Sequence, residues 1–234
     1  MPLPPQAAKI SDIGEHYWAK NETHDAHHHA FRERQMTGRT YELHGLRLTC
    51  PAGIYQPDEI SSTRFILREL LLCAHLYGPR ALDMGTGSGA IALALAKSGK
   101  FVTATDIDPE AVLCAQANAE DNDLSIDVRC SDLFSAVNGE RFDLIVFNAP
   151  LRHDRVEHPV DRVACDPDGE LTLRFLREAP AHLTAGGSIV LLAASSGRRE
   201  ALMEGLSAFD HRVIAAEYSS TLSSFRWLLV AQPR

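Results

Sequence analysis

Apolar and polar positions along this chain follow two different periods. Short apolar runs, typical of buried strands, alternate with segments in which apolar residues recur at helical spacing. The runs predict strands at residues 80–84, 101–105, 126–129, 142–147 and 188–194, and the spacing predicts helices at residues 61–77, 90–97, 109–119, 171–183 and 198–209. Two last apolar segments, 213–216 and 227–231, follow one another with no helix between them.

This alternation predicts an α/β fold in which a seven-stranded, mostly parallel sheet carries helices on both faces. The two last strands lack a crossover helix, so we expect them to form an antiparallel pair at one edge of the sheet. The fold class is therefore a Rossmann-like α/β sheet.

The first forty residues have a different pattern. Residues 41–49 alternate apolar and polar side chains around Gly45, which predicts a short hairpin. Upstream of it, apolar residues recur at roughly helical spacing from Ile10 to Trp18. We therefore expect a helical N-terminal segment, residues 1–44, followed by the main domain, residues 45–234.

Composition narrows the class of protein. Hydrophobic residues make up 45% of the chain and charged residues 23%, as in folded globular domains. The formal charge of −8 disfavours binding to nucleic acid or to a lipid surface. The five cysteines are scattered and never form a Cys-x-x-Cys pair, and no apolar run reaches roughly 18 residues. We expect a cytoplasmic protein without membrane or nucleic acid partners, and the sequence is equally compatible with a monomer and an oligomer.

A glycine-rich loop lies between the first strand of the main domain and the next helix. Gly85, Gly87 and Ala90 match the pattern G-x-G-x-x-A, and Asp106 follows about twenty residues later at the end of the next strand. Glycines at this place let a ligand approach the backbone and the helix N-terminus. By spacing alone, NAD and S-adenosylmethionine are both compatible with the loop.

Electrostatics favours S-adenosylmethionine. Asp83, two residues before the first glycine, would repel a pyrophosphate, and no lysine or arginine nearby compensates for it. An ammonium and a sulfonium are instead attracted to a carboxylate. In either case Asp106 suits a ribose diol as the acceptor of two hydrogen bonds.

Several segments together resemble class I S-adenosylmethionine-dependent methyltransferases, in particular the HemK-like and "small" methyltransferase group. They are residues 53–57, 82–89, 105–108, 131–134 and 142–150, and the resemblance extends from about residue 45 to residue 194. It implies S-adenosylmethionine as the cofactor. The implied cofactor-binding residues are Asp83, Gly85, Thr86 and Gly87 at the methionyl part, Asp106 at the ribose, and Ile107, Asp132 and Leu133, with Phe134 as its neighbour, at the adenine.

The acceptor loop departs from the family. HemK-like enzymes end the fourth strand in Asn-Pro-Pro-Tyr, whereas this chain has Asn148, Ala149, Pro150 and Leu151. Asn148 is expected to touch the cofactor and to orient a nitrogen nucleophile, for which alignment matters more than acid-base help. Leu151 offers no aromatic face, so glutamine and adenine are less suited as acceptors. We therefore expect methylation of a small molecule, at nitrogen.

Aromatic residues near the N-terminus are candidates for a lid. Tyr17 and Tyr55, with Trp18 and Tyr41, are predicted to face the sulfonium by cation-π attraction. Simple packing of the N-terminal segment onto the core is the competing interpretation. A histidine cluster, residues 24–29, has metal-ligand spacing, but amine methylation needs no metal and we expect none.

Other functions stay open at this point. The cofactor's own amine could attack its γ-carbon to give azetidine-2-carboxylate and methylthioadenosine, or an acceptor could take the aminocarboxypropyl group. A protein glutamine methyltransferase is a further alternative. A degenerate domain that binds partners without turnover, and an NAD-dependent oxidoreductase, complete the set.

Overall fold

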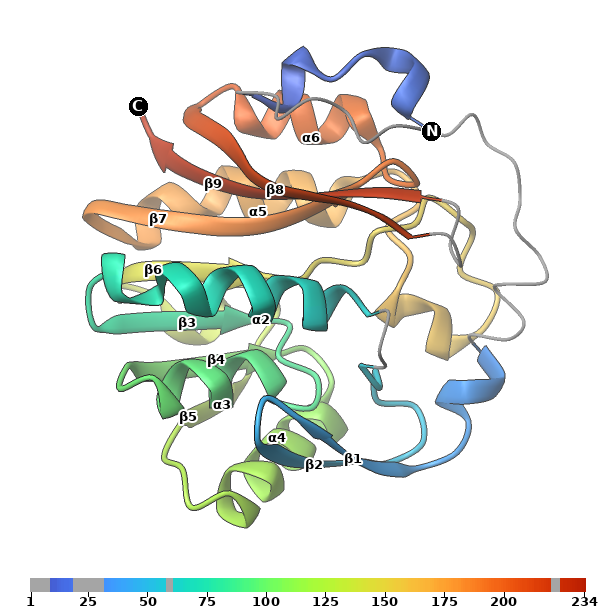
Figure 1. The fold of residues 1–234 in the computed structure, drawn as a ribbon, viewed down its shortest axis with the longest axis vertical. Helices are drawn as coiled ribbons and strands as arrows, with labels where there is room; N and C mark the ends of the chain where they lie inside the picture. The colour runs from blue at the N-terminus through green and yellow to red at the C-terminus, as the bar shows by residue number, and fades with distance from the viewer. Residues whose placement is uncertain (1–8, 19–31, 58–60, 220–223) are drawn as a thin grey trace.

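The computed structural model describes residues 9–18, 32–57, 61–219 and 224–234. Within these ranges the main sheet has seven strands in the order β5-β4-β3-β6-β7-β9-β8 (Figure 1). The strands are β3 (Arg80–Met84), β4 (Phe101–Asp106), β5 (Asp127–Cys130), β6 (Phe142–Phe147), β7 (Leu183–Ala194), β8 (Phe209–Ser219) and β9 (Ser224–Pro233). The five strands from β5 to β7 are parallel, and β9 is antiparallel to both β7 and β8. The predicted Rossmann-like fold with its antiparallel edge pair is confirmed.

Helices cover both faces of the sheet. They are α2 (Ser62–Cys73), α3 (Ala90–Lys97), α4 (Pro109–Asp121), α5 (Glu170–Glu178) and α6 (Arg199–Leu206). Buried residues of α2 and α3 pack with one set of sheet side chains, whereas those of α5 and α6 pack with the other set. Alternate side chains of a strand point to opposite faces, so a nearly continuous apolar run such as β6 serves both layers.

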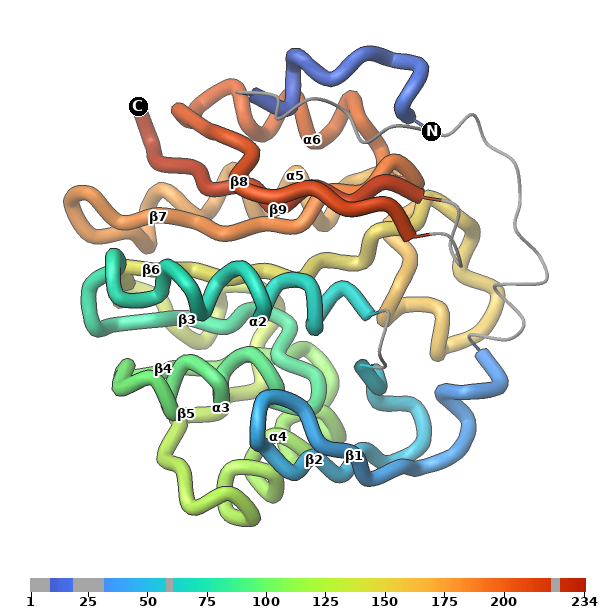
Figure 2. Tube along the Cα trace, in the orientation of Figure 1, coloured from blue at the N-terminus to red at the C-terminus, as the bar shows by residue number. Residues whose placement is uncertain are grey.

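A separate two-stranded hairpin, β1 (Arg39–Leu43) and β2 (Leu46–Cys50), lies beside α4 (Figure 2). Its turn, His44 and Gly45, has positive φ at both residues, as tight hairpin turns require. The predicted boundary between residues 44 and 45 therefore falls inside the hairpin, where β1 pairs with β2.

The N-terminal segment forms two short 3₁₀ turns, Ile10–Asp12 and Glu15–Tyr17, where helical spacing predicted a helix. Ile10 and Ile13 are buried in the core layer that contains α5 and α6, and the segment that carries them runs over α6 (Figure 2). A continuous helix does not form here, because the buried side chains of Ile10 and Ile13 anchor the segment to the sheet. The two short turns, joined at Gly14, follow that surface.

Candidate active site

The carboxyl ends of three neighbouring strands bring the candidate site together. Met84 at the end of β3 is paired with Thr105 of β4 on one side and with Phe147 of β6 on the other. Each of these strands continues directly into predicted site residues. The glycine loop, Asp106 and Asn148 therefore lie at one level of the same sheet edge, where ligands bind in open α/β sheets.

The glycine loop has backbone geometry that side chains disfavour. Gly85, Gly87 and Gly89 have φ values of +63°, +54° and +81°. A Cβ added at Gly85 would lie 3.3 Å from the Phe147 ring, and one at Gly89 would lie 3.2 Å from Ala115. No described atom lies within 4 Å of a Cβ added at Gly87. Gly87 thus leaves open space where a ligand can approach the backbone.

Asp83 holds the glycine loop through two hydrogen bonds. Its side chain is 1% exposed, and Oδ2 accepts hydrogen bonds from the Thr86 hydroxyl at 2.6 Å and from the Ala92 backbone N–H at 3.0 Å. Burial raises the pKa of Asp83 to about 7. Both contacts join the loop to the first turn of α3. Asp83 thus positions the loop, and its contact with a cofactor stays a prediction.

Asp106 lies at the end of β4 against the loop. Oδ2 accepts a hydrogen bond from the Gly87 N–H at 2.8 Å, and Oδ1 accepts one from the Asp108 N–H at 3.0 Å. Burial raises the pKa of this carboxyl. Each oxygen keeps a further lone pair for an incoming hydroxyl. The arrangement fits a ribose diol beside Gly87.

The residues predicted at the adenine end have different surroundings. Ile107 is 68% exposed, an unusual state for a large apolar side chain and one that a flat apolar ring would relieve. Leu133 is 5% exposed, and Phe134 stacks on His182 inside the core. Asp132 forms an exposed ion pair with Arg174, at 2.7 Å. The contact of Ile107 with adenine stays a prediction that its exposure allows, while Asp132 already has a partner.

Asn148 is the residue of the acceptor loop whose amide is half satisfied. Its Nδ2 donates a hydrogen bond to the Thr63 hydroxyl at 3.2 Å. Its Oδ1 is buried, and no described residue gives it a hydrogen bond. An unpaired buried carbonyl oxygen is costly unless a ligand donates to it. The site therefore contains one buried acceptor ready for an N–H group.

The four aromatic candidates lie in different places. The Tyr17 ring meets Phe225 edge-on at 5.2 Å, and the Trp18 ring lies 5.0 Å from Trp227. Both therefore pack onto β9, which agrees with the competing interpretation of simple packing. The lid function of residues 1–44 stays a prediction.

The other two tyrosines lie nearer the site. The Tyr41 hydroxyl is 3.5 Å from the Ser88 hydroxyl in the glycine loop. The Tyr55 hydroxyl is 3.4 Å from the Ser62 hydroxyl, next to the Thr63 that holds Asn148. Of the two tyrosines predicted to act in catalysis, Tyr55 therefore lies beside the start of α2, near Asn148, whereas Tyr17 lies on β9.

Two contacts of the acceptor region were not predicted. One is the hydrogen bond between Thr63 and Asn148. The other is the ion pair of Arg32 with the fully buried Asp161, at 2.7 Å. No sequence signal could have paired them, because 85 residues separate Thr63 from Asn148 and 129 separate Arg32 from Asp161.

The described residues hold no group of three or more His, Cys, Asp and Glu side chains that could bind a metal, and the histidine cluster at residues 24–29 lies outside them. None of the described helices is long and apolar enough to cross a bilayer.

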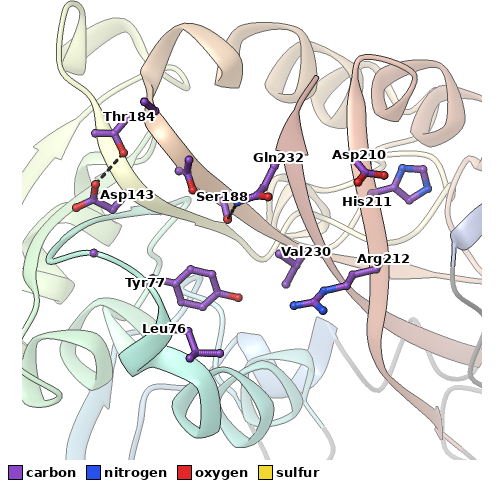
Figure 3. Close-up of a pocket in the computed structure, with 14 residues that line it drawn as sticks. Leu76, Tyr77, Asp143, Thr184, Ser188, Asp210, His211, Arg212, Val230 and Gln232 are labelled. Carbon is purple, nitrogen blue, oxygen red and sulfur yellow. Dashed lines mark hydrogen bonds between the residues drawn. The ribbon is translucent and has the colours of Figure 1, made fainter.

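A groove of about 580 Å³ opens at the opposite edge of the sheet (Figure 3). It lies at the amino-terminal ends of the parallel strands, between Tyr77, Thr184 and Arg212. None of the predicted site residues lines it. Since catalytic sites of such sheets form at the carboxyl edge, this groove is not the candidate active site.

Comparison with known proteins identifies the class. The chain matches the Methyltransferase small domain family over residues 45–218. It is 34% identical over 169 residues to a putative protein N5-glutamine methyltransferase of Methanocaldococcus jannaschii, covering 69% of this chain and 83% of the relative. The chain belongs to the methyltransferase small domain family, of the class I S-adenosylmethionine-dependent methyltransferases.

Two other relatives have different substrates. Ribosomal RNA small subunit methyltransferase C of Alcanivorax borkumensis is 33% identical over 167 residues, which are 70% of this chain and 47% of that protein. The solved structure of a Thermus thermophilus 16S rRNA N2 methyltransferase, in complex with AdoMet and guanosine, superposes with a TM-score of 0.63 at 26% identity, covering 84% of this chain and 50% of that one. The chain thus spans about half the length of these relatives.

These comparisons correct two expectations. The relatives are named for protein glutamine and ribosomal RNA substrates, so the predicted small-molecule substrate and the exclusion of nucleic acid partners were wrong. Net charge describes the whole chain and does not show which charges surround the site. The absence of an aromatic ring at Leu151 was likewise too local a feature to define the acceptor. The predicted cofactor and methyltransferase class are confirmed.

Proposed function

We propose that this protein transfers a methyl group from S-adenosylmethionine to the side-chain amide nitrogen of a glutamine in a protein. The observation that carries the proposal is the buried, unpartnered Oδ1 of Asn148, at the end of the strand next to the glycine loop. A primary amide has the N–H groups that this oxygen lacks. The 34% identity to the M. jannaschii relative supports the same acceptor class.

When bound, S-adenosylmethionine supplies a methyl group on a positively charged sulfur. Asp106 would hold the ribose, and Gly87 leaves room for the cofactor beside the loop. Asn148 would then accept a hydrogen bond from an N–H of the acceptor and aim the nitrogen at the methyl carbon. S-adenosylhomocysteine would be the leaving group, and the methylated nitrogen would lose one proton to water. Holding two reactants in line is the largest contribution that such a site makes to this reaction.

The ribosomal RNA relatives suggest a second acceptor, the exocyclic amine of guanine, which also presents N–H groups to Asn148. The protein acceptor stays the main proposal, because the chain covers 83% of the M. jannaschii relative, which is named for glutamine, and only 47% and 50% of the two ribosomal RNA relatives.

The test uses S-adenosylmethionine labelled in its methyl group, offered to the purified protein alone, with a ribosome-free protein extract, and with deproteinised ribosomal RNA. Labelled N5-methylglutamine in digested protein is the expected result, and Asn148→Ala is the matched control that should lower it sharply, to a residual rate. Labelled methylguanosine would assign the RNA acceptor instead. Methylthioadenosine formed from the cofactor alone would overturn methyl transfer.

A further inference from the structure

The two ends of the Asn148 side chain have different surroundings. Nδ2 donates to the Thr63 hydroxyl at 3.2 Å, whereas Oδ1 is buried without a partner among the described residues. A side-chain amide that rotates by 180° exchanges a donor for an acceptor. The contact with Thr63 therefore affects whether the substrate meets the oxygen or the NH2 group of Asn148.

Thr63 is placed rigidly. It is the second residue of α2 and is 4% exposed. Ser61 caps this helix by accepting a hydrogen bond from the Arg64 N–H at 3.2 Å. The next residues, Phe65 and Ile66, are 1% and 0% exposed and anchor the helix in the core. The Thr63 hydroxyl is therefore held in place by packing that does not involve the acceptor loop.

We propose that Thr63 is a positioning residue that selects the acceptor. By accepting a hydrogen bond from Nδ2, it occupies that end of the amide and fixes the side-chain rotamer, so that Oδ1 is the end left for the substrate and the site favours a nitrogen that carries N–H groups. With the amide reversed, the site would present a donor, and the amide or amine nitrogen would have no acceptor for its hydrogens. This inference rests on the proposed function of Asn148.

Kinetics of variants tests the positioning role. Thr63→Val removes the hydroxyl at nearly constant volume, and we expect kcat to fall by about tenfold or more while S-adenosylhomocysteine affinity changes by less than about twofold. Thr63→Ser keeps the hydroxyl and should restore most of kcat. Thr63→Ala is a second variant, should the valine hinder folding.

Two further comparisons separate positioning from a structural role. Ser61→Ala perturbs the same helix end without touching Asn148, so it should lower the melting temperature and leave kcat unchanged. In an Asn148→Ala background, Thr63→Val should cause no additional loss of kcat, because it acts through that side chain. A wild-type kcat in Thr63→Val, or an equal loss in both backgrounds, would overturn the proposal.

A measurement without an acceptor keeps this inference distinct from the proposed function. By nuclear magnetic resonance, the side-chain amide hydrogens of Asn148 should exchange with water more slowly in the wild type than in Thr63→Val. Equal exchange rates would show that Thr63 does not hold the amide. Failure to find any methylated macromolecule, with the exchange difference present, would reject the proposed function and leave the positioning contact established.

Discussion

The two halves of the active-site edge are built in different ways. The cofactor half, residues 83–108, is joined by hydrogen bonds between residues close in sequence: Asp83 with Thr86, three apart, and Asp106 with Gly87, nineteen apart. The acceptor half, residues 32–37, Thr63 and 148–161, is joined by contacts across 85 and 129 residues. The difference teaches that one half is formed by a local motif, whereas the other needs the whole chain to fold.

The geometry of the acceptor half depends on a buried charge. Asp161 is 0% exposed and accepts two hydrogen bonds from the Arg32 guanidinium, at 2.7 and 2.8 Å, and two from the backbone N–H groups of Glu157 and His158, both at 2.9 Å. The contact ties residue 32 to the loop that follows Asn148. Gln35, three residues after Arg32, connects the same segment to residue 56, because its side-chain oxygen accepts a hydrogen bond from the Gln56 N–H at 2.9 Å.

The largest expected effect is in the cofactor half. Asp106→Ala removes the acceptor of both ribose hydroxyls and the partner of Gly87, so S-adenosylhomocysteine should bind about 100-fold more weakly. Titration calorimetry measures this. Asp108→Ala is the matched control, since Asp108 caps α4 by accepting from the Glu110 N–H, and its loss should cost about 1 kcal/mol of stability without changing affinity. Unchanged affinity in Asp106→Ala would remove the ribose assignment.

The acceptor half is tested next by Arg32→Ala. Its loss leaves Asp161 without its guanidinium partner and frees the acceptor loop, so turnover should fall by about 10-fold to 100-fold while cofactor affinity stays unchanged. Arg32→Lys keeps the charge without the two-point geometry and should give an intermediate rate. If cofactor affinity fell together with turnover, the two halves would not be independent.

A smaller effect concerns pH and the glycine loop. Burial raises the pKa of Asp83 to about 7, so between about pH 4 and pH 7 the folded state holds a proton that the unfolded state has lost. The extra proton on Asp83 therefore stabilises the folded state at low pH. As pH rises from about 4 to about 7, this contribution to the free energy of unfolding falls by up to about 1.4 kcal/mol per pH unit.

Asp83→Asn removes this dependence. The amide stays neutral and its oxygen still accepts from Thr86 and Ala92. The variant should therefore lose less stability than the wild type between pH 5 and pH 7, both values lying inside the window of about pH 4 to pH 7. Urea unfolding at both pH values measures it. Parallel changes in the two proteins would show that Asp83 does not titrate there.

The smallest effect is expected at the adenine end. Asp132 and Arg174 are each about half exposed, so Asp132→Asn should change stability by less than about 1 kcal/mol. Its effect on cofactor affinity should be well below that of Asp106→Ala, because the Asp132 carboxylate already has a partner. Arg174→Ala frees that carboxylate and should leave affinity equal or tighter. A loss as large as that of Asp106→Ala would make Asp132 a principal adenine contact.

The order and type of the strands followed from the sequence because apolar runs and helical spacing are local properties. The predicted backbone was wrong at residues 9–18, where Ile10, Ile13, Tyr17 and Trp18 match helical spacing but belong to two 3₁₀ turns and their caps, packed on β8, β9 and α6. Their apolar side chains do have a buried surface, as the spacing indicates. The shape of that surface, made by residues two hundred positions away, decided the backbone.

The sequence by itself determined the fold class and the strand-end positions of Asp106 and Asn148, since parallel strands end at one edge. The charge of Asp83 and the family resemblance, rather than the glycine spacing, indicated the cofactor. Only the tertiary structure decided that Thr63 holds the Asn148 amide, that Arg32 ties the N-terminal region to Asp161, and that Tyr17 and Trp18 pack on β9. These pairs have no sequence signature, because side chains far apart along the chain meet only after the sheet and its helices have closed.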